Sequence, residues 1–169
     1  MRGTPKDYVA TAEAEWQEER PDLDLAGMRV FARAERILRL GRSRVDEVCK
    51  RYNLDAGELD VLAALRRSGE PYALRPTELF QGLIISSSGL TARLHRLEER
   101  KLVVRKTSSE DRRSSMVRLS AKGQRLIDNA FADKIAVENE LLGGLEPKER
   151  QTLSLLLAKL AHELEAEGE

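Results

Sequence analysis

Residues 85–120 read ISSSGLTARLHRLEERKLVVRKTSSEDRRSSMVRLS, and the spacing of apolar residues changes halfway along. In the first half, Leu90, Leu94 and Leu97 recur at helical spacing, and small polar residues fall on the opposite face. The second half holds two short runs rich in β-branched and apolar residues, LVVRK and SMVRL, joined by a polar tract that favours a turn. This stretch therefore predicts a helix followed by a two-stranded hairpin.

Two further helices are predicted just upstream. Residues 54–69, LDAGELDVLAALRRSG, offer Asp55 as an N-cap, repeat leucine at three-residue steps and close on Gly69. The segment RPTELFQGL then opens a short helix at Pro76 or Thr77. A short helix, a brief connection and a helix that is apolar on one side and small-polar on the other are typical of a helix-turn-helix. The hairpin that follows such a motif is called a wing.

Helices are also predicted on both sides of this motif. A short helix within residues 4–20 ends at Pro21, a second runs from Leu25 to Arg42, and a third reaches Tyr52. The second helix carries a basic stripe, interpreted as a solvated face, at Arg29, Arg33 and Arg36. Ser120 caps a long helix that GGLEP interrupts, and Pro147 starts the last helix. That helix carries a leucine stripe at positions 153, 156, 157, 160 and 164.

A continuous leucine stripe at the end of the chain requires another helix to cover it, and a second copy of the chain is the simplest source. The predicted fold class is mainly α with a small β-wing: a winged helix-turn-helix flanked by N- and C-terminal dimerisation helices. We expect one integrated domain in three parts. Those parts are residues 1–53, residues 54–120 and residues 121–169.

Composition agrees with one helical domain, since 34% of the 169 residues are charged and 4% are aromatic. The net charge is zero, yet residues 73–120 hold ten Lys or Arg against five Asp or Glu. A basic segment within a neutral chain indicates an anionic partner for that segment. No apolar run approaches the roughly 18 residues of a membrane helix, and the N-terminus lacks a signal-peptide segment, so a cytoplasmic protein is expected.

Several kinds of chemistry are not predicted. The single Cys49 permits no internal disulfide and is interpreted as a buried thiol. His95 and His162 are isolated, so neither a metal site nor a cofactor is expected. The sequence has no nucleophile motif and no glycine-rich phosphate loop with lysine. The chain is therefore not expected to be an enzyme.

The basic segment has the parts that DNA binding requires. The major groove admits a helix, and small polar side chains let that helix approach the base edges; Ser87, Ser88 and Thr91 are such residues, and Arg96 is placed with them. Minor grooves accept arginine from a thin loop, as Arg112 and Arg113 would provide. One alternative is an ordinary solvated turn. Another is a winged helix used as a protein-interaction module, which would favour an apolar exposed face.

The segments LRPTELF, SSSGLTARLHRLEERKLVVRK and SSEDRRSSMVRLSAKG resemble the MarR family of bacterial winged-helix transcription regulators, and the similarity runs from about Leu25. The resemblance implies a homodimer on a pseudo-palindromic operator of double-stranded DNA, usually acting as a repressor and released by a small ligand. It also implies that residues 1–53 supply dimerisation and a ligand pocket, that residues 54–120 bind DNA, and that residues 121–169 complete the dimer. Lys101 stands where such proteins often carry glycine after the recognition helix. That glycine is a helix C-cap preference, so its loss should cost little.

A narrower resemblance is to the urate-responsive branch of this family. That branch has an extra N-terminal helix with a tryptophan, an aspartate before the helix-turn-helix, and arginines in the recognition helix and wing. The matching residues are Trp16, Asp60, Arg93 and Arg105. Asp60 and Arg105 are expected to pair without ligand, and an anion held by Arg93 would repel Asp60 and displace the recognition helix. Another carboxylate, a phenolic ligand or Cys49 oxidation remain alternatives.

Overall fold

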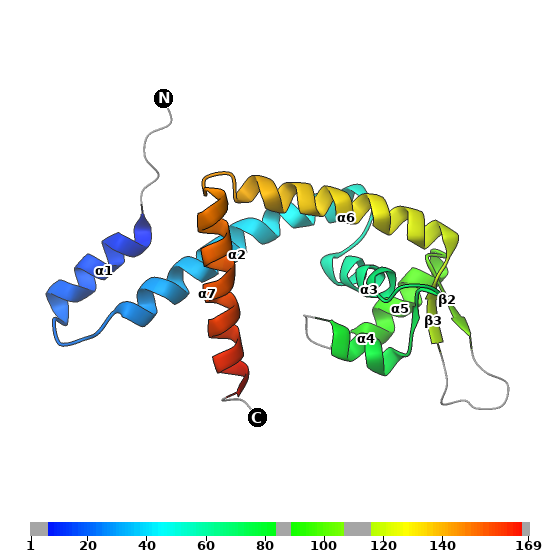
Figure 1. Ribbon diagram of the computed structural model, residues 1–169, viewed down its shortest axis with the longest axis horizontal. Coiled ribbons are helices and arrows are strands. Elements are labelled where there is room, and N and C mark those ends of the chain that lie inside the picture. The colour runs from blue at the N-terminus through cyan, green and yellow to red at the C-terminus, as the bar shows by residue number, and fades with distance from the viewer. Residues whose placement is uncertain (1–6, 84–88, 107–115, 167–169) are drawn as a thin grey trace. The chain divides into compact units, whose positions relative to one another are not determined.

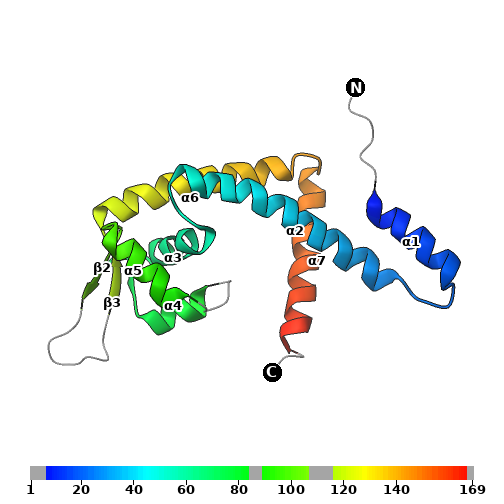
Figure 2. The same ribbon diagram turned by 180° about the vertical axis from the view of Figure 1, so that it is seen from behind.

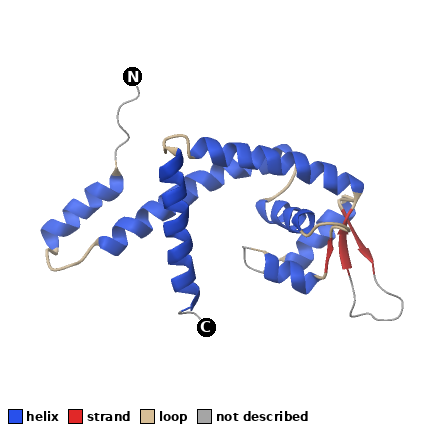
Figure 3. Cartoon of the chain, viewed as in Figure 1, coloured by secondary structure: helices blue, strands red, loops and turns tan. Residues whose placement is uncertain are grey.

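The structure is a computed structural model that describes residues 7–83, 89–106 and 116–166. The chain divides into two compact units, Met1–Arg44 and Val45–Glu169. Residues 45–53 thus belong with the DNA-binding segment and the C-terminal helices rather than with the N-terminus. Helices dominate both units, and the strands are confined to one small sheet (Figure 3). This arrangement confirms the predicted mainly helical class.

The N-terminal unit contains α1 (Tyr8–Glu19) and most of α2 (Ala26–Arg51). Asp7 caps α1 because its carboxylate accepts hydrogen bonds from the backbone of Val9 and Ala10. In the basic stripe of α2, Arg29 is exposed and Arg33 and Arg36 are half-buried, and each has a partner on α1 or at its N-cap. Three contacts link the helices: Arg29 with Glu13 at 3.0 Å, Arg33 with Asp7 at 2.7 Å, and Arg36 over the Tyr8 ring at 5.1 Å. The stripe is therefore an electrostatic contact with α1, not only a solvated face.

One continuous helix, α2, replaces the two helices predicted between Leu25 and Tyr52. A glycine such as Gly41 costs a helix interior about 1 kcal/mol, which is too little to end a helix supported on both sides. The helix ends at Arg51, and Asn53, two residues further on, has a left-handed φ of 53°. There the Leu54 N–H donates to the Cys49 carbonyl at 2.9 Å, closing a Schellman-type cap.

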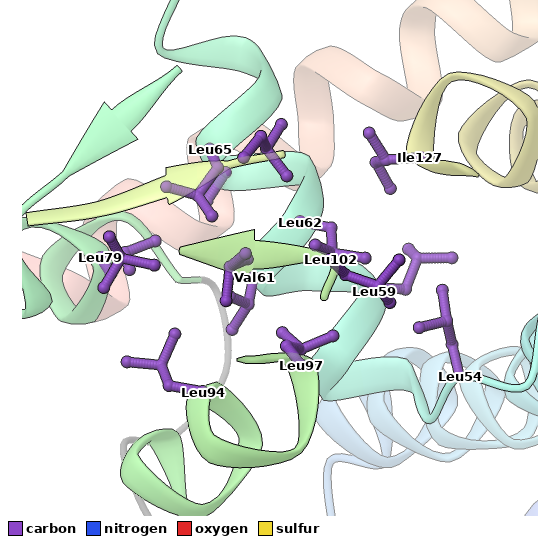
Figure 4. Close-up of a cluster of buried hydrophobic side chains, with 14 of the residues drawn as sticks. Leu54, Leu59, Val61, Leu62, Leu65, Leu79, Leu94, Leu97, Leu102 and Ile127 are labelled. Carbon is purple, nitrogen blue, oxygen red and sulfur yellow. The ribbon is translucent and has the colours of Figure 1, made fainter. Parts of the chain in front are cut away.

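The second unit is built around α3 (Ala56–Arg67), which packs against α4 (Pro76–Gly82), α5 (Leu90–Glu99), α6 (Ala121–Leu141) and the sheet. These elements gather along the first half of α6, as the two opposite views show (Figures 1 and 2). The predicted leucine steps of α3 supply its buried face. Leu59 and Leu62 point towards Leu97 of α5 and Leu102 beyond it (Figure 4). This shared apolar core positions α5.

The sheet has three strands in the order β1-β3-β2, all antiparallel. The predicted hairpin is β2 (Val103–Lys106) and β3 (Met116–Leu119), with Val103 opposite Leu119. The sequence analysis missed β1 (Ala73–Leu74), which pairs with β3. A strand of two residues is too short to show the alternation of apolar and polar residues that predicts a strand, so β1 can be recognised only by its pairing with β3.

Helix α6 begins as predicted, because Ser120 Oγ accepts a hydrogen bond from the Gly123 N–H at 2.9 Å. A side chain at Gly123 would place Cβ 2.0 Å from the Leu102 carbonyl oxygen, so the close approach of α6 to this turn requires glycine. Helix α7 (Pro147–Ala166) has no buried residue. Across the described residues, we find no helix with the length and apolarity needed to cross a bilayer.

Candidate DNA interface and effector pocket

Helix α5 presents two different faces. Leu90, Leu94 and Leu97 are buried, as their spacing predicted, whereas Thr91 and His95 are exposed. Gly89 precedes the helix with a φ of 97°, a conformation that L side chains rarely adopt. A helix with a small polar exposed face at Thr91 suits close approach to base edges in a major groove. Ser87 and Ser88 lie outside the described residues.

The wing strands connect directly to α5. Arg105 of β2 lies with Nε 3.3 Å from Glu98 Oε2 of α5, so an ion pair joins wing and helix. On the neighbouring strand, Arg118 is exposed. The tip of the hairpin, with Arg112 and Arg113, falls in residues 107–115, which lie outside the described part of the chain.

Arg96, also placed among the DNA contacts, has carboxylate partners within the protein. Its Nε lies 2.7 Å from Glu58 Oε1, and its Nη2 lies 2.7 Å from Asp55 Oδ2. This pairing was not predicted from the sequence. Asp55 was predicted as an N-cap, but nothing local indicates that the free oxygens of Asp55 and Glu58 face another helix.

A cavity of about 400 Å³ lies between α3 and α6. Its apolar lining includes Ile127, Phe131 and Leu83, and its charged lining comprises Asp60, Arg66, Arg67, Asp128 and Lys134. Arg66 Nε and Asp128 Oδ1 pair across the cleft at 2.7 Å. The Lys134 ammonium lies 5.6 Å from the Phe131 ring centroid, within cation–π range. The cavity thus combines a flat apolar surface with cations.

Asp60 is half-buried in this lining. Burial raises the pKa of its carboxyl group above the ordinary value, although the positive charges of Lys134 and Arg93 act in the opposite direction. A carboxyl group in this setting can accept a hydrogen bond from a ligand N–H or O–H. Perturbed carboxyl groups beside cavities are frequent at functional sites.

Three residues of the urate-type set, Asp60, Arg93 and Arg105, belong to the second unit, and of these three only Asp60 lines the cavity. Arg105 pairs with Glu98 rather than with Asp60, and Arg93 lies 3.9 Å from Asp55 while still influencing the Asp60 pKa. Trp16 is about half exposed on α1 of the other unit. Lys134 and Phe131, which sequence reasoning missed, are on α6 and come to the cavity only through packing.

Other chemistry has little support in the described residues. No three His, Cys, Asp or Glu side chains gather there as candidate metal ligands. Cys49 is 1% exposed within the core, and burial, followed by the charges of Asp46, Asp60 and Asp55, raises the pKa of its thiol. A buried thiol with a raised pKa is a poor nucleophile.

A three-helix motif whose last helix exposes the polar residues Thr91 and His95, followed by an antiparallel hairpin, defines a winged helix-turn-helix DNA-binding protein. Comparison with known proteins supports this class. The model of the MarR family matches residues 52–114. The chain is also 36% identical over 150 residues to the HTH-type transcriptional regulator PecS of Dickeya dadantii (strain 3937), covering 89% of this chain and 90% of that protein. The chain belongs to the MarR family of DNA-binding transcriptional regulators, whose members are not enzymes.

Two solved structures show the same fold. BpsR of Bordetella bronchiseptica, whose DNA binding is regulated by 6-hydroxynicotinic acid, is 25% identical with a TM-score of 0.68, over 78% of this chain and 92% of that chain. A mutant MarR of E. coli complexed with operator DNA is 23% identical with a TM-score of 0.66, over 86% and 96% of the two chains.

Proposed function

We propose that this protein is a homodimeric repressor that occupies a pseudo-palindromic operator and is released by a small aromatic anion bound in the cavity between α3 and α6. The cavity carries the proposal, because α3 packs directly against α5, the helix that reads DNA. A ligand that binds better to one position of α3 and α6 would bias the placement of α5.

The lining of the cavity supports this ligand class. Phe131 and Ile127 offer apolar surface to a ring, Lys134 and Arg67 offer positive charge, and Asp60 offers an acceptor. The matching ligand is a flat molecule with an anionic group and a separate N–H or O–H. Urate and hydroxylated aromatic carboxylates both have these features. The similarity to BpsR, regulated by 6-hydroxynicotinic acid, supports the second class.

Cys49 oxidation is a weaker candidate for the signal. Its thiol is buried and its pKa is raised, both of which disfavour the reactive thiolate. A small ligand acting at the cavity therefore fits the structure better than a redox signal.

The dimer is proposed from exposed apolar surface. Helix α7 leaves Leu155 65% exposed and Leu156 60% exposed, and α2 leaves Ile37 65% exposed. Apolar surface on this scale usually marks an interaction site. Two copies related by twofold symmetry would also present two α5 helices to half-sites about one helical turn, roughly 10 bp, apart.

The test is a titration of the full-length protein onto a labelled duplex from its own upstream intergenic region, at fixed salt. Urate and 6-hydroxynicotinate are added separately. At least one should release the wild type, and Lys134→Gln should require about tenfold more ligand, the effect of removing one charge-assisted hydrogen bond. Lys50→Gln, on the exposed side of α2, serves as the charge-matched control and should respond like the wild type.

Release of Lys134→Gln at the wild-type ligand concentration would place the effector elsewhere. Specific binding that neither compound reverses would reject this ligand class while leaving DNA binding intact. Because Trp16 is the single tryptophan, quenching of its emission by the ligand tests separately the prediction that Trp16 contacts it.

A further inference from the structure

Two arginines of α5, Arg93 and Arg96, and Arg100 at its C-cap form a stripe that contacts the start of α3, with Arg96 still 46% exposed. Arg93, Arg96 and Arg100 are spaced i, i+3 and i+7, so they lie along one side of the helix. Their neighbours are the turn and first residues of α3. Arg96 bonds Asp55 and Glu58, while Arg100 Nη1 lies 3.4 Å from Glu58 Oε2 and its Nη2 donates to the Tyr52 carbonyl at 3.3 Å.

Glu58 is the centre of this cluster. It is the one charged residue found buried in the described chain, at 4% exposure. Its Oε1 accepts from Arg96, and its Oε2 accepts both from the Asp55 backbone N–H at 3.1 Å and from Arg100. A buried carboxylate is tolerated only when it is paired in this way. The same side chain therefore closes the N-terminal cap of α3 and holds two positions of α5.

Gly57 gives independent evidence that the first turn of α3 is shaped for this stripe. A Cβ at position 57 would lie 2.3 Å from Arg93 Nε and 2.5 Å from Arg93 Cζ. The guanidinium therefore rests directly on the bare backbone of Gly57. The first turn of α3 thus packs against one side of α5. The contacts join Asp55, Gly57 and Glu58 to Arg93, Arg96 and Arg100.

We propose that Glu58, assisted by Asp55, is a positioning residue for sequence-specific DNA binding: it fixes the rotation and axial position of the recognition helix α5 through Arg96 and Arg100 without touching DNA. Leucines alone leave α5 able to rotate and slide slightly, because apolar contacts are not directional. Charge-assisted hydrogen bonds are directional. A reading helix must be held within about 0.5 Å, so this cluster determines whether Thr91 and its neighbours meet the intended base edges.

A second consequence concerns the arginines themselves. While Glu58 holds them, Arg96 and Arg100 are withheld from DNA phosphates, which any sequence would offer equally. Removal of the Glu58 charge should therefore lower binding to the preferred sequence and leave binding to other sequences unchanged or stronger. A residue needed only for stability would lower both in proportion.

The experiment begins with selection of a preferred duplex from a random library by the full-length wild type. Affinities for that duplex and for a scrambled version are then measured at one salt concentration. Glu58→Gln keeps the shape and the capping acceptor but removes the charge. We expect about tenfold weaker binding to the preferred duplex, the scale of discrimination that one side chain on a base edge provides. We expect no weakening on the scrambled duplex.

Asp133→Asn is the matched control, because Asp133 of α6 also holds two partners, Tyr52 at 2.9 Å and Arg51 at 3.3 Å, neither on α5. It should bind both duplexes like the wild type. Arg96→Lys is the second variant: it keeps the charge but cannot bridge two carboxylates as a guanidinium does. It should lose preferred binding as Glu58→Gln does, whereas a simple phosphate contact would survive.

Amide hydrogen exchange checks that the fold persists. In Glu58→Gln, faster exchange should be confined to α5 and the first turn of α3, with α6 unchanged. Equal reduction of affinity on both duplexes would overturn the proposal. So would unchanged preferred binding by Glu58→Gln, or wild-type behaviour of Arg96→Lys.

Discussion

At the scale of single residues, Lys101 shows what the loss of a preferred glycine means. Its φ is 59°, and its N–H donates to the Glu98 carbonyl at 2.8 Å while the next N–H reaches Leu97 at 2.9 Å. The same Schellman-type cap follows the end of α2, where Asn53 is the left-handed residue. A side chain in the left-handed region costs about 1–2 kcal/mol. That cost is a sizeable fraction of the usual 5–15 kcal/mol of stability, so the small cost expected from the sequence stays a prediction.

Lys101→Gly should therefore raise the free energy of unfolding by about 1 kcal/mol, because glycine adopts this φ without strain. Urea unfolding measures the change. Lys101→Ala, which keeps a Cβ, should stay close to the wild type and separates backbone strain from loss of the side chain. A glycine variant no more stable than the alanine variant would contradict the argument.

Asp60 gives a pH prediction. Burial raises its pKa in the folded protein, so the native state binds this proton more tightly than the unfolded chain does. Its stabilising contribution is fully present below the unfolded pKa of about 3.9 and is lost as the pH rises through the folded pKa. Asp60→Asn removes this dependence, and the variant should gain more stability over the wild type at pH 7 than at pH 4.

Urea unfolding at the two pH values tests this difference. Asp46→Asn changes an exposed carboxylate of α2 and is the control for the loss of one negative charge elsewhere in the chain. An equal gain for Asp60→Asn at both pH values would mean that Asp60 is not destabilised by burial.

At the scale of elements, the start of α6 depends on one close approach. Gly123 lies so near the Leu102 carbonyl that a methyl group would meet it at 2.0 Å. Gly123→Ala should lower the free energy of unfolding by about 1–3 kcal/mol or more, since backbone must move. Gly27→Ala, where nothing lies within 4 Å, should be neutral or slightly stabilising. Similar stability of the two variants in thermal unfolding would refute the packing argument.

The wing carries the second prediction at this scale. Arg112→Ala and Arg113→Ala should each weaken binding to the selected duplex, because each removes a candidate groove or phosphate cation. The slope of log affinity against log salt should become shallower by about 1 for each DNA phosphate that no longer meets an arginine. Fluorescence anisotropy over a salt series measures the slope. An unchanged slope in both variants would mean that the wing tip does not contact DNA.

At the scale of the whole molecule, the exposed leucines of α7 predict the oligomeric state. A chain ending at Gly144 should sediment as a monomer, because it lacks the stripe that a second copy would cover. Leu156→Glu in the full chain should also dissociate the dimer, whereas Gln151→Glu, an exposed polar position on the same helix, should not. Sedimentation velocity distinguishes the species. A truncated chain that remains dimeric would move the dimer interface elsewhere.

The sequence by itself determined the order and type of most elements. Local periodicity placed Leu59 and Leu62 on one face of α3 and Leu90, Leu94 and Leu97 on one face of α5. Two helix starts were predicted from their N-cap residues, Asp55 and Ser120, whose side chains accept hydrogen bonds from the backbone three residues later. These features were predictable because their partners lie within a few residues along the chain.

Only the tertiary structure decided which charged groups meet. Arg105 pairs with Glu98 rather than with Asp60. Lys134 of α6 lines the cavity beside α3. Glu58 forms ion pairs with both Arg96 and Arg100. Likewise β1 formed only against β3. No local pattern encodes such contacts, because a long charged side chain can reach any of several partners. The choice among them follows from how the apolar faces have already brought the helices together.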